Sequence, residues 1–180
     1  HGPDTFLYMV GDNLSPFATS PLVKFDLSLF SGMTVQGDAT FSIHASHVTA
    51  TGGDRFIDLH QVLIPWSEGS VTWNNFGSTP GIQFGTDVAA SPMDSELLTP
   101  TDAPLTLQFT IPHALIQSWI DSPETNHGLL LHMVTGSDVN FDATELGGIQ
   151  PSLTFEVVPE PSGTVLLLGS VGLLAMRRRR

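Results

Sequence analysis

One segment of the chain alternates strictly between apolar and polar residues. In residues 105–111, large apolar residues occupy the odd positions and Thr, Gln and Thr the even ones. Because successive side chains of a β-strand point to opposite faces, this pattern predicts a strand with one buried face. The same alternation recurs in further segments, through Val23, Phe25 and Leu27; Phe41, Ile43 and Ala45; Ile57, Leu59 and Leu63; Leu129, Leu131 and Met133; and Leu153, Phe155 and Val157. Glycine-containing turn signals at 30–32, 51–54, 78–81 and 146–148 separate many of these segments, so we expect an all-β, antiparallel sandwich rather than a parallel sheet with crossover helices.

A single short helix is expected directly after residues 105–111. Pro112 suits the first position of a helix, and Asp121-Ser-Pro123 ends the segment. The apolar residues that share one face of this helix are Leu115, Ile116, Trp119 and Ile120. We expect the helix to cover apolar core at one end of the sandwich and Trp119 to be buried.

The charges of the chain are divided unevenly along it. All eighteen acidic residues lie in residues 1–160, together with only two of the six cations, Lys24 and Arg55, so this part has a net charge of −16. Nucleic acids and other polyanions are bound largely through clustered Lys and Arg, which this part lacks, so we expect no nucleic-acid partner. The chain has no cysteine, which excludes disulfides and thiolate metal sites.

The C-terminal residues 159–180 have a different composition from the 1–158 domain. Pro159, Glu160 and Pro161 precede an apolar run at 164–176, and the chain ends in Arg177, Arg178, Arg179 and Arg180. The apolar run is shorter than the roughly 20 residues that span a bilayer core, and the arginines would be retained on the cytoplasmic side of a membrane. We therefore interpret these residues as a processed anchor of an exported protein, rather than as a buried core helix. The two prolines make the stretch before the apolar run extended and accessible to an enzyme.

These three parts resemble the PEP-CTERM sorting signal of Gram-negative bacteria, with its Pro-Glu-Pro motif, hydrophobic helix and basic cluster. The resemblance implies an exosortase-type processing enzyme, transient anchoring in the inner membrane, and a final place at the cell surface, the outer membrane or an extracellular exopolysaccharide matrix. We expect a signal peptide and one further β-strand to precede His1.

The 1–158 domain also resembles a known family. Val23-Lys-Phe-Asp-Leu-Ser28, then Ala39-Thr-Phe41 and above all Trp66-Ser-Glu-Gly-Ser-Val-Thr-Trp-Asn74 are similar to segments of DNRLRE-type domains, and Thr5-Phe-Leu-Tyr8 looks like the second strand of that family. The resemblance implies a jelly-roll sandwich related to carbohydrate-binding modules.

Two tryptophans in the most specific of these segments are candidate glycan contacts. An exposed indole ring packs against the apolar face of a sugar, so Trp66 and Trp73 could line a polysaccharide site. The alternative is that both are structural anchors in the core.

Asp138, Asn140 and Asp142 alternate oxygen ligands in residues 137–142, a spacing that could wrap a calcium ion. The alternative is a solvated acidic loop.

The sequence contains no nucleophile elbow and no phosphate loop, and we expect no catalytic residues.

Taken together, the residues predict an exported, non-catalytic surface or matrix protein that binds or associates with polysaccharide. One alternative is a structural surface protein stabilised by calcium, with no glycan site. Another is an accessory domain of a larger carbohydrate-active enzyme.

Overall fold

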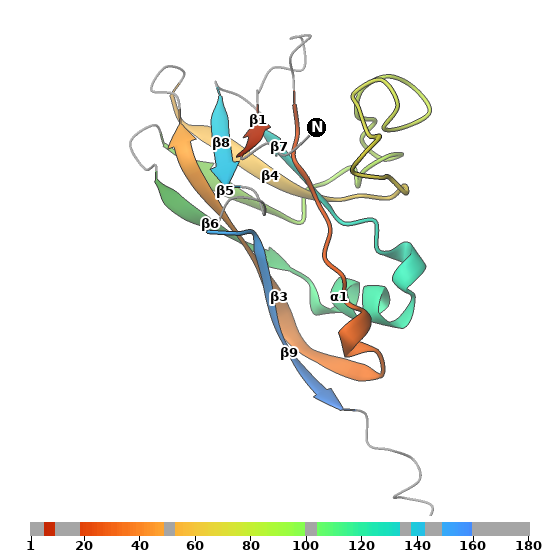
Figure 1. Ribbon diagram of the computed structural model, residues 1–180. Coiled ribbons are helices and arrows are strands. Elements are labelled where there is room, and N and C mark those ends of the chain that lie inside the picture. Colours follow the sequence, from red (N-terminus) through yellow and green to blue (C-terminus); the bar gives the residue numbers. More distant parts are fainter. Residues whose placement is uncertain are drawn as a thin grey trace, which may run out of the picture.

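The computed structural model describes residues 6–9, 19–48, 53–99, 104–133, 138–142 and 149–159. Within these residues the chain forms two β-sheets and one α-helix, and all pairs of named strands are antiparallel (Figure 1). The prediction of an all-β antiparallel fold with one short helix is thus confirmed.

The five-stranded sheet is built around one long strand, β3 (Met33–Val48). One edge of β3 pairs with β6 (Leu105–Ile111). Other ladders join β3 to β8 (Val139–Asp142) and, further along its length, to β9 (Ser152–Pro159). Strand β1 (Phe6–Met9) pairs with β8, which agrees with the strand expected from the family resemblance at this position.

The four-stranded sheet has the order β2-β7-β4-β5. Its central strands are β7 (Leu129–Met133) and β4 (Arg55–Gln61), flanked by β2 (Leu22–Val23) and β5 (Asp94–Leu98). Strand β5 was not anticipated, because Asp94-Ser-Glu96 gives this edge strand a polar start. Strand β2 is shorter than expected, since the chain turns after Val23 toward a 3₁₀ turn at Ser28–Phe30, where the Asp26 carboxylate accepts the Ser28 N–H at 2.9 Å.

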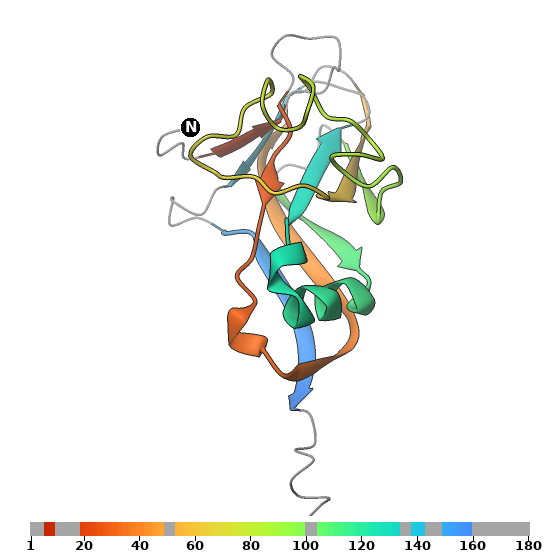
Figure 2. The ribbon, with the colours of Figure 1, turned by 90° about the vertical axis from the view of Figure 1, so that its right-hand side faces the viewer.

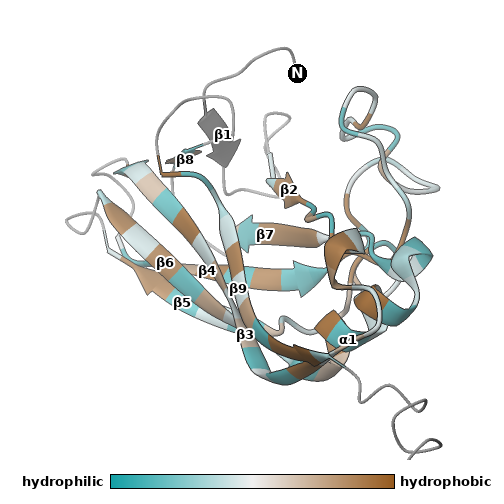
Figure 3. Ribbon diagram, turned by 60° about the horizontal axis from the view of Figure 1, so that its bottom comes forward, coloured by the Kyte–Doolittle hydropathy of each residue, from teal (hydrophilic) through white to brown (hydrophobic). Residues whose placement is uncertain are grey.

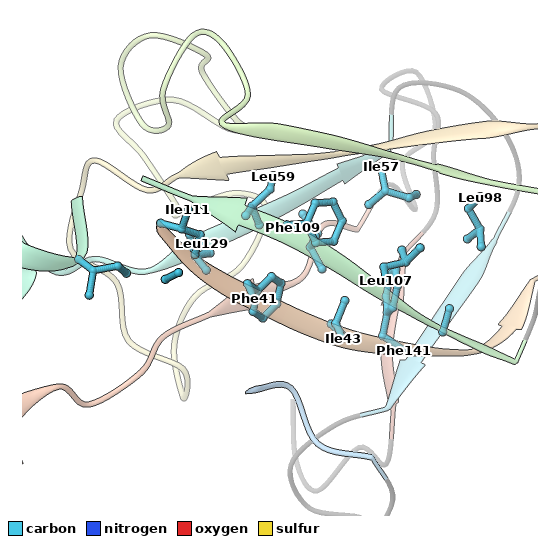
Figure 4. Close-up of a cluster of buried hydrophobic side chains, with 14 of the residues drawn as sticks. Phe41, Ile43, Ile57, Leu59, Leu98, Leu107, Phe109, Ile111, Leu129 and Phe141 are labelled. Atoms are coloured by element: carbon cyan, nitrogen blue, oxygen red, sulfur yellow. The ribbon is translucent and has the colours of Figure 1, made fainter. Parts of the chain in front are cut away.

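The core lies between the two sheets. Its fully buried side chains come from alternate positions of facing strands, for example Phe41 on β3, Phe109 on β6 and Leu59 on β4 (Figure 4). Apolar and polar bands alternate along these strands in Figure 3, which is the pattern that predicted them. The two sheets therefore form a β-sandwich with one shared core.

The helix α1 (His113–Asp121) lies at one end of the sheets, beside the first half of β3 (Figure 1). Pro112 is its N-cap residue, so the helix begins one position after the expected start at Pro112. Trp119 is 2% exposed and joins the shared core, which confirms that prediction. A second 3₁₀ turn, Pro123–Thr125, follows.

No helix among the described residues is long and apolar enough to cross a membrane.

Candidate functional site

The longest connection that the structure describes runs between β4 and β5, over residues 62–93, and is called here the 62–93 loop. It emerges from the four-stranded sheet as a folded coil, drawn in yellow to green in Figure 2. Beneath it lies a second apolar cluster, formed by Val62, Phe76 and Val88 of the loop and Leu130 of β7. The loop is therefore packed against the sheet through its own small core.

Hydrogen bonds within the loop fix the segment that carries the two candidate tryptophans. Ser67 O accepts the N–H groups of Ser70 and Val71 at 3.1 and 2.9 Å. The Asn75 side chain accepts the Thr72 N–H at 2.6 Å and donates to Ser70 O at 2.8 Å. Residues 67–75 are thus preorganised by local contacts, which lowers the entropic cost of presenting a side chain to a ligand.

Trp66 is a structural anchor. Its indole N–H donates to the carbonyl oxygen of His127 at 2.7 Å, and its ring packs against the second apolar cluster. Because the only hydrogen-bond donor of the ring is used inside the protein, Trp66 has no polar group left for a sugar. Burial, and to a smaller extent the charge of Lys24, lowers the pKa of the His127 imidazole below its ordinary value.

Trp73 lies at the surface of the same loop and is 40% exposed. Its carbonyl oxygen accepts the Gly81 N–H at 2.8 Å. A methyl group added to Gly81 would lie 3.1 Å from Cζ2 of the indole ring, so the ring rests close to the Gly81 backbone. The structure therefore separates the two tryptophans into one that holds the loop and one that it presents to solvent.

No protein-family model matches this chain, and no curated protein is significantly similar to it.

The calcium candidates lie on or next to strand β8 of the five-stranded sheet, whereas both tryptophans lie in the 62–93 loop, which joins two strands of the four-stranded sheet. The sequence predicts a cation-wrapping loop, whereas Val139–Asp142 is strand β8. Alternate residues of a strand are about 7 Å apart on one face, so Asp138 and Asp142 lie about 13 Å apart along it. Calcium holds its oxygens at about 2.3–2.6 Å. One ion could therefore be bound by at most two of the three residues Asp138, Asn140 and Asp142.

Among the residues that the structure describes, no group of three His, Asp or Glu could hold a metal ion. Calcium binding at Asp138, Asn140 and Asp142 stays a prediction.

Arg55 was not singled out from the sequence, yet its side chain is completely buried. It alternates with Ile57 and Leu59 on the core-facing side of β4, and this placement could have been predicted from the strand pattern. Burial lowers the pKa of the guanidinium below its ordinary value, while the charges of Asp138 and Asp54 oppose this effect.

The predicted sorting motif is only partly covered by the structure. Pro159 is the last residue of β9, opposite Met33 of β3. Glu160, Pro161 and the apolar run with its arginines lie outside the described residues.

Proposed function

We propose that this chain is an exported, non-catalytic protein that associates with polysaccharide through the 62–93 loop. The observation that carries the proposal is the exposure of Trp73 on a loop that is otherwise held by its own core and hydrogen bonds. An indole ring offers a rigid apolar surface together with an N–H donor, the combination that suits the amphipathic face of a sugar ring. Asn74, the next residue, is also exposed and could supply amide groups to sugar hydroxyls.

The charge of the domain favours a neutral polysaccharide. Its cations in the described residues are Lys24, which is exposed, and Arg55, which is buried. A polyuronate would therefore meet a surface dominated by carboxylates, and repulsion between like charges opposes such a complex.

The two family resemblances also support a proposal for how the protein is exported and where it resides. The sandwich of five and four antiparallel strands is compatible with a jelly roll of the DNRLRE type. The Pro-Glu-Pro motif and the basic tail support processing by an exosortase-type enzyme after transient anchoring in the inner membrane. The mature protein would then reside at the cell surface or in the exopolysaccharide matrix of a Gram-negative bacterium.

The test is binding of the chain to immobilised neutral glucans, mannans and galactans, with a uronic-acid polymer as the acidic comparison, each with and without calcium. Trp73→Ala should weaken binding about 30-fold, the effect of losing about 2 kcal/mol at a central aromatic contact. Trp66→Phe is the matched control, because it keeps an aromatic ring in the loop core while removing the bond to His127 and part of the packed ring. It should lower the melting temperature while leaving the affinity within a few-fold of the unchanged chain.

Equal affinities of Trp73→Ala and the unchanged chain would contradict the proposal. Absence of binding to every polymer, by a chain whose near-UV circular dichroism shows an intact core, would favour the structural surface protein instead. A rise in melting temperature with calcium would then support the calcium-stabilised form of that alternative.

A further inference from the structure

The far turn of the 62–93 loop, residues 81–89, presses an aromatic ring onto two histidines of the sheet. The ring of Phe84 lies 5.0 Å from that of His60 and 5.0 Å from that of His132, between ring centroids. His60 belongs to β4 and His132 to β7, and the two imidazole rings are 6.2 Å apart. The three edge-to-face contacts bring one side chain of the loop and two titratable side chains of the sheet together.

His60 is held in one tautomer. Its ring is 2% exposed, and its Nδ1 lies 2.9 Å from the carbonyl oxygen of Ala89. Since a carbonyl oxygen can only accept a hydrogen bond, Nδ1 carries the proton, and Nε2 of the neutral ring is the unprotonated nitrogen. Nε2 is buried and has no hydrogen-bond partner among the described residues. A proton added to Nε2 would thus find no acceptor while the 81–89 turn covers the ring.

His132 is partly buried in the same place. Burial lowers the pKa of its imidazole below the ordinary value, His60 lowers it further, and Asp58 opposes both effects. The Asp58 carboxylate itself accepts the Ser95 hydroxyl at 2.6 Å. Asp87, the acidic residue of the turn, directs its carboxylate to the Gln83 N–H at 3.0 Å. The closed turn therefore favours the neutral form of His132.

The same turn supports Trp73. Gly81, against which the indole ring rests, lies three residues before Phe84. Between them the Gln83 N–H is held by the Asp87 carboxylate at 3.0 Å, and directly after Phe84 the Gly85 N–H donates to Val88 O at 2.7 Å. A displacement of Phe84 would accordingly be transmitted to the backbone beneath Trp73.

We propose that the 81–89 turn is a latch that protonation of His132 releases, so that acidification displaces Phe84 and loosens Trp73. A proton binds better where the imidazole is hydrated, and it shifts the population toward the open turn by that difference in affinity. The consequence for polysaccharide binding, namely weaker binding in acid, rests on the proposed function. The movement of the turn itself does not.

The test is acrylamide quenching of tryptophan fluorescence in the chain of residues 1–180 and in its Trp73→Phe variant, whose difference isolates Trp73. The Trp73-dependent quenching constant should rise about twofold or more between about pH 7.5 and pH 5, the range in which histidine titrates. His132→Gln should abolish this rise. His44→Gln is the matched control, because His44 lies on β3 of the other sheet and bonds Thr106 instead.

A rise that persists in His132→Gln, or no rise in the unchanged chain, would overturn the latch. A second readout covers the case in which His132→Gln perturbs folding: in Phe84→Leu, the pKa of His132 followed by NMR should move up toward its ordinary value, and an unmoved pKa counts against the latch.

Polysaccharide binding at both pH values separates the two proposals. If acid raises the quenching of Trp73 but no polysaccharide binds at either pH, the latch is supported and the proposed function is contradicted. Binding that is equal at both pH values, with unchanged quenching, leaves the proposed function and removes the latch.

Discussion

Replacing Gly128 by alanine should destabilise the fold at the base of the 62–93 loop. Gly128 has a φ of +85°, and a Cβ added there would overlap the carbonyl oxygen of Val23 and lie 3.1 Å from Cβ of Lys24. Val23 is held in the β2–β7 ladder opposite Leu129, so its backbone cannot move without breaking that ladder. Gly128 O also accepts the Val62 N–H at 3.0 Å, where the loop begins.

The magnitude follows from two separate costs. The left-handed backbone costs an alanine about 1–2 kcal/mol, and the forced backbone shift adds about 1–3 kcal/mol, as overpacking does. Gly32 provides the matched control, because its φ is +74° and an added Cβ there meets nothing within 4 Å. Gly32→Ala should therefore show the first cost alone, and Gly128→Ala the sum.

Urea and thermal unfolding, each followed by circular dichroism, measure the free energies and melting temperatures of both variants against the unchanged chain. For a domain of this size 1 kcal/mol corresponds to about 2–4 °C, so Gly128→Ala should lower the melting temperature by roughly 4–20 °C. Equal losses at the two glycines, within about 0.5 kcal/mol, would refute the claim that steric overlap with Val23 matters. A changed m-value would mean that the free energies of the variants cannot be compared directly.

Two further predictions concern the helix and the tail. Gln117→Leu should cost about 1–3 kcal/mol by urea unfolding, because its side chain accepts the N–H of buried Val35 at 2.8 Å, whereas Gln108→Leu on an exposed face should be near neutral. Changing Pro159 and Pro161 together to alanine should leave the unprocessed chain in the inner-membrane fraction of its host, and normal processing would contradict the role proposed for the tail.

The parts of the fold that the sequence predicts are those in which one strand face is buried and the other is not. Strand β6 is the clearest case, since Leu107, Phe109 and Ile111 are buried and the residues between them are exposed. The first half of β3 gave no such signal, because Gln36, Gly37 and Asp38 are all exposed and interrupt the alternation. Its pairing with β9 shifts register at this point, which no local pattern records.

The sequence predicts which segment carries the candidate site, but it does not predict how the side chains of that segment are placed. The sequence marks Trp66 and Trp73 equally, and what distinguishes them is the His127 carbonyl, which reaches Trp66 only when β7 lies beside β4. The contact of His60 with His132 has the same origin, because it depends on the register that sets Asp58 opposite His132. Such contacts follow from strand pairing over long sequence separations, which the local periodicity of the sequence does not predict.

The arrangement of polar contacts explains why the 62–93 loop is the part of the described chain best suited to a ligand. A binding surface must be rigid enough to avoid a large ordering cost and yet keep an apolar side chain in solvent. The loop meets the first condition through Asn75, Asp87 and the Trp66 anchor, and the second through Trp73. Its contacts with the sheet include an apolar cluster, backbone hydrogen bonds such as that from the Ala89 N–H to Gln61 O, and the contact of Phe84 with two histidines. Of these, the proposed latch makes only the histidine contact sensitive to acid, so the loop can loosen locally while the sandwich beneath it stays folded.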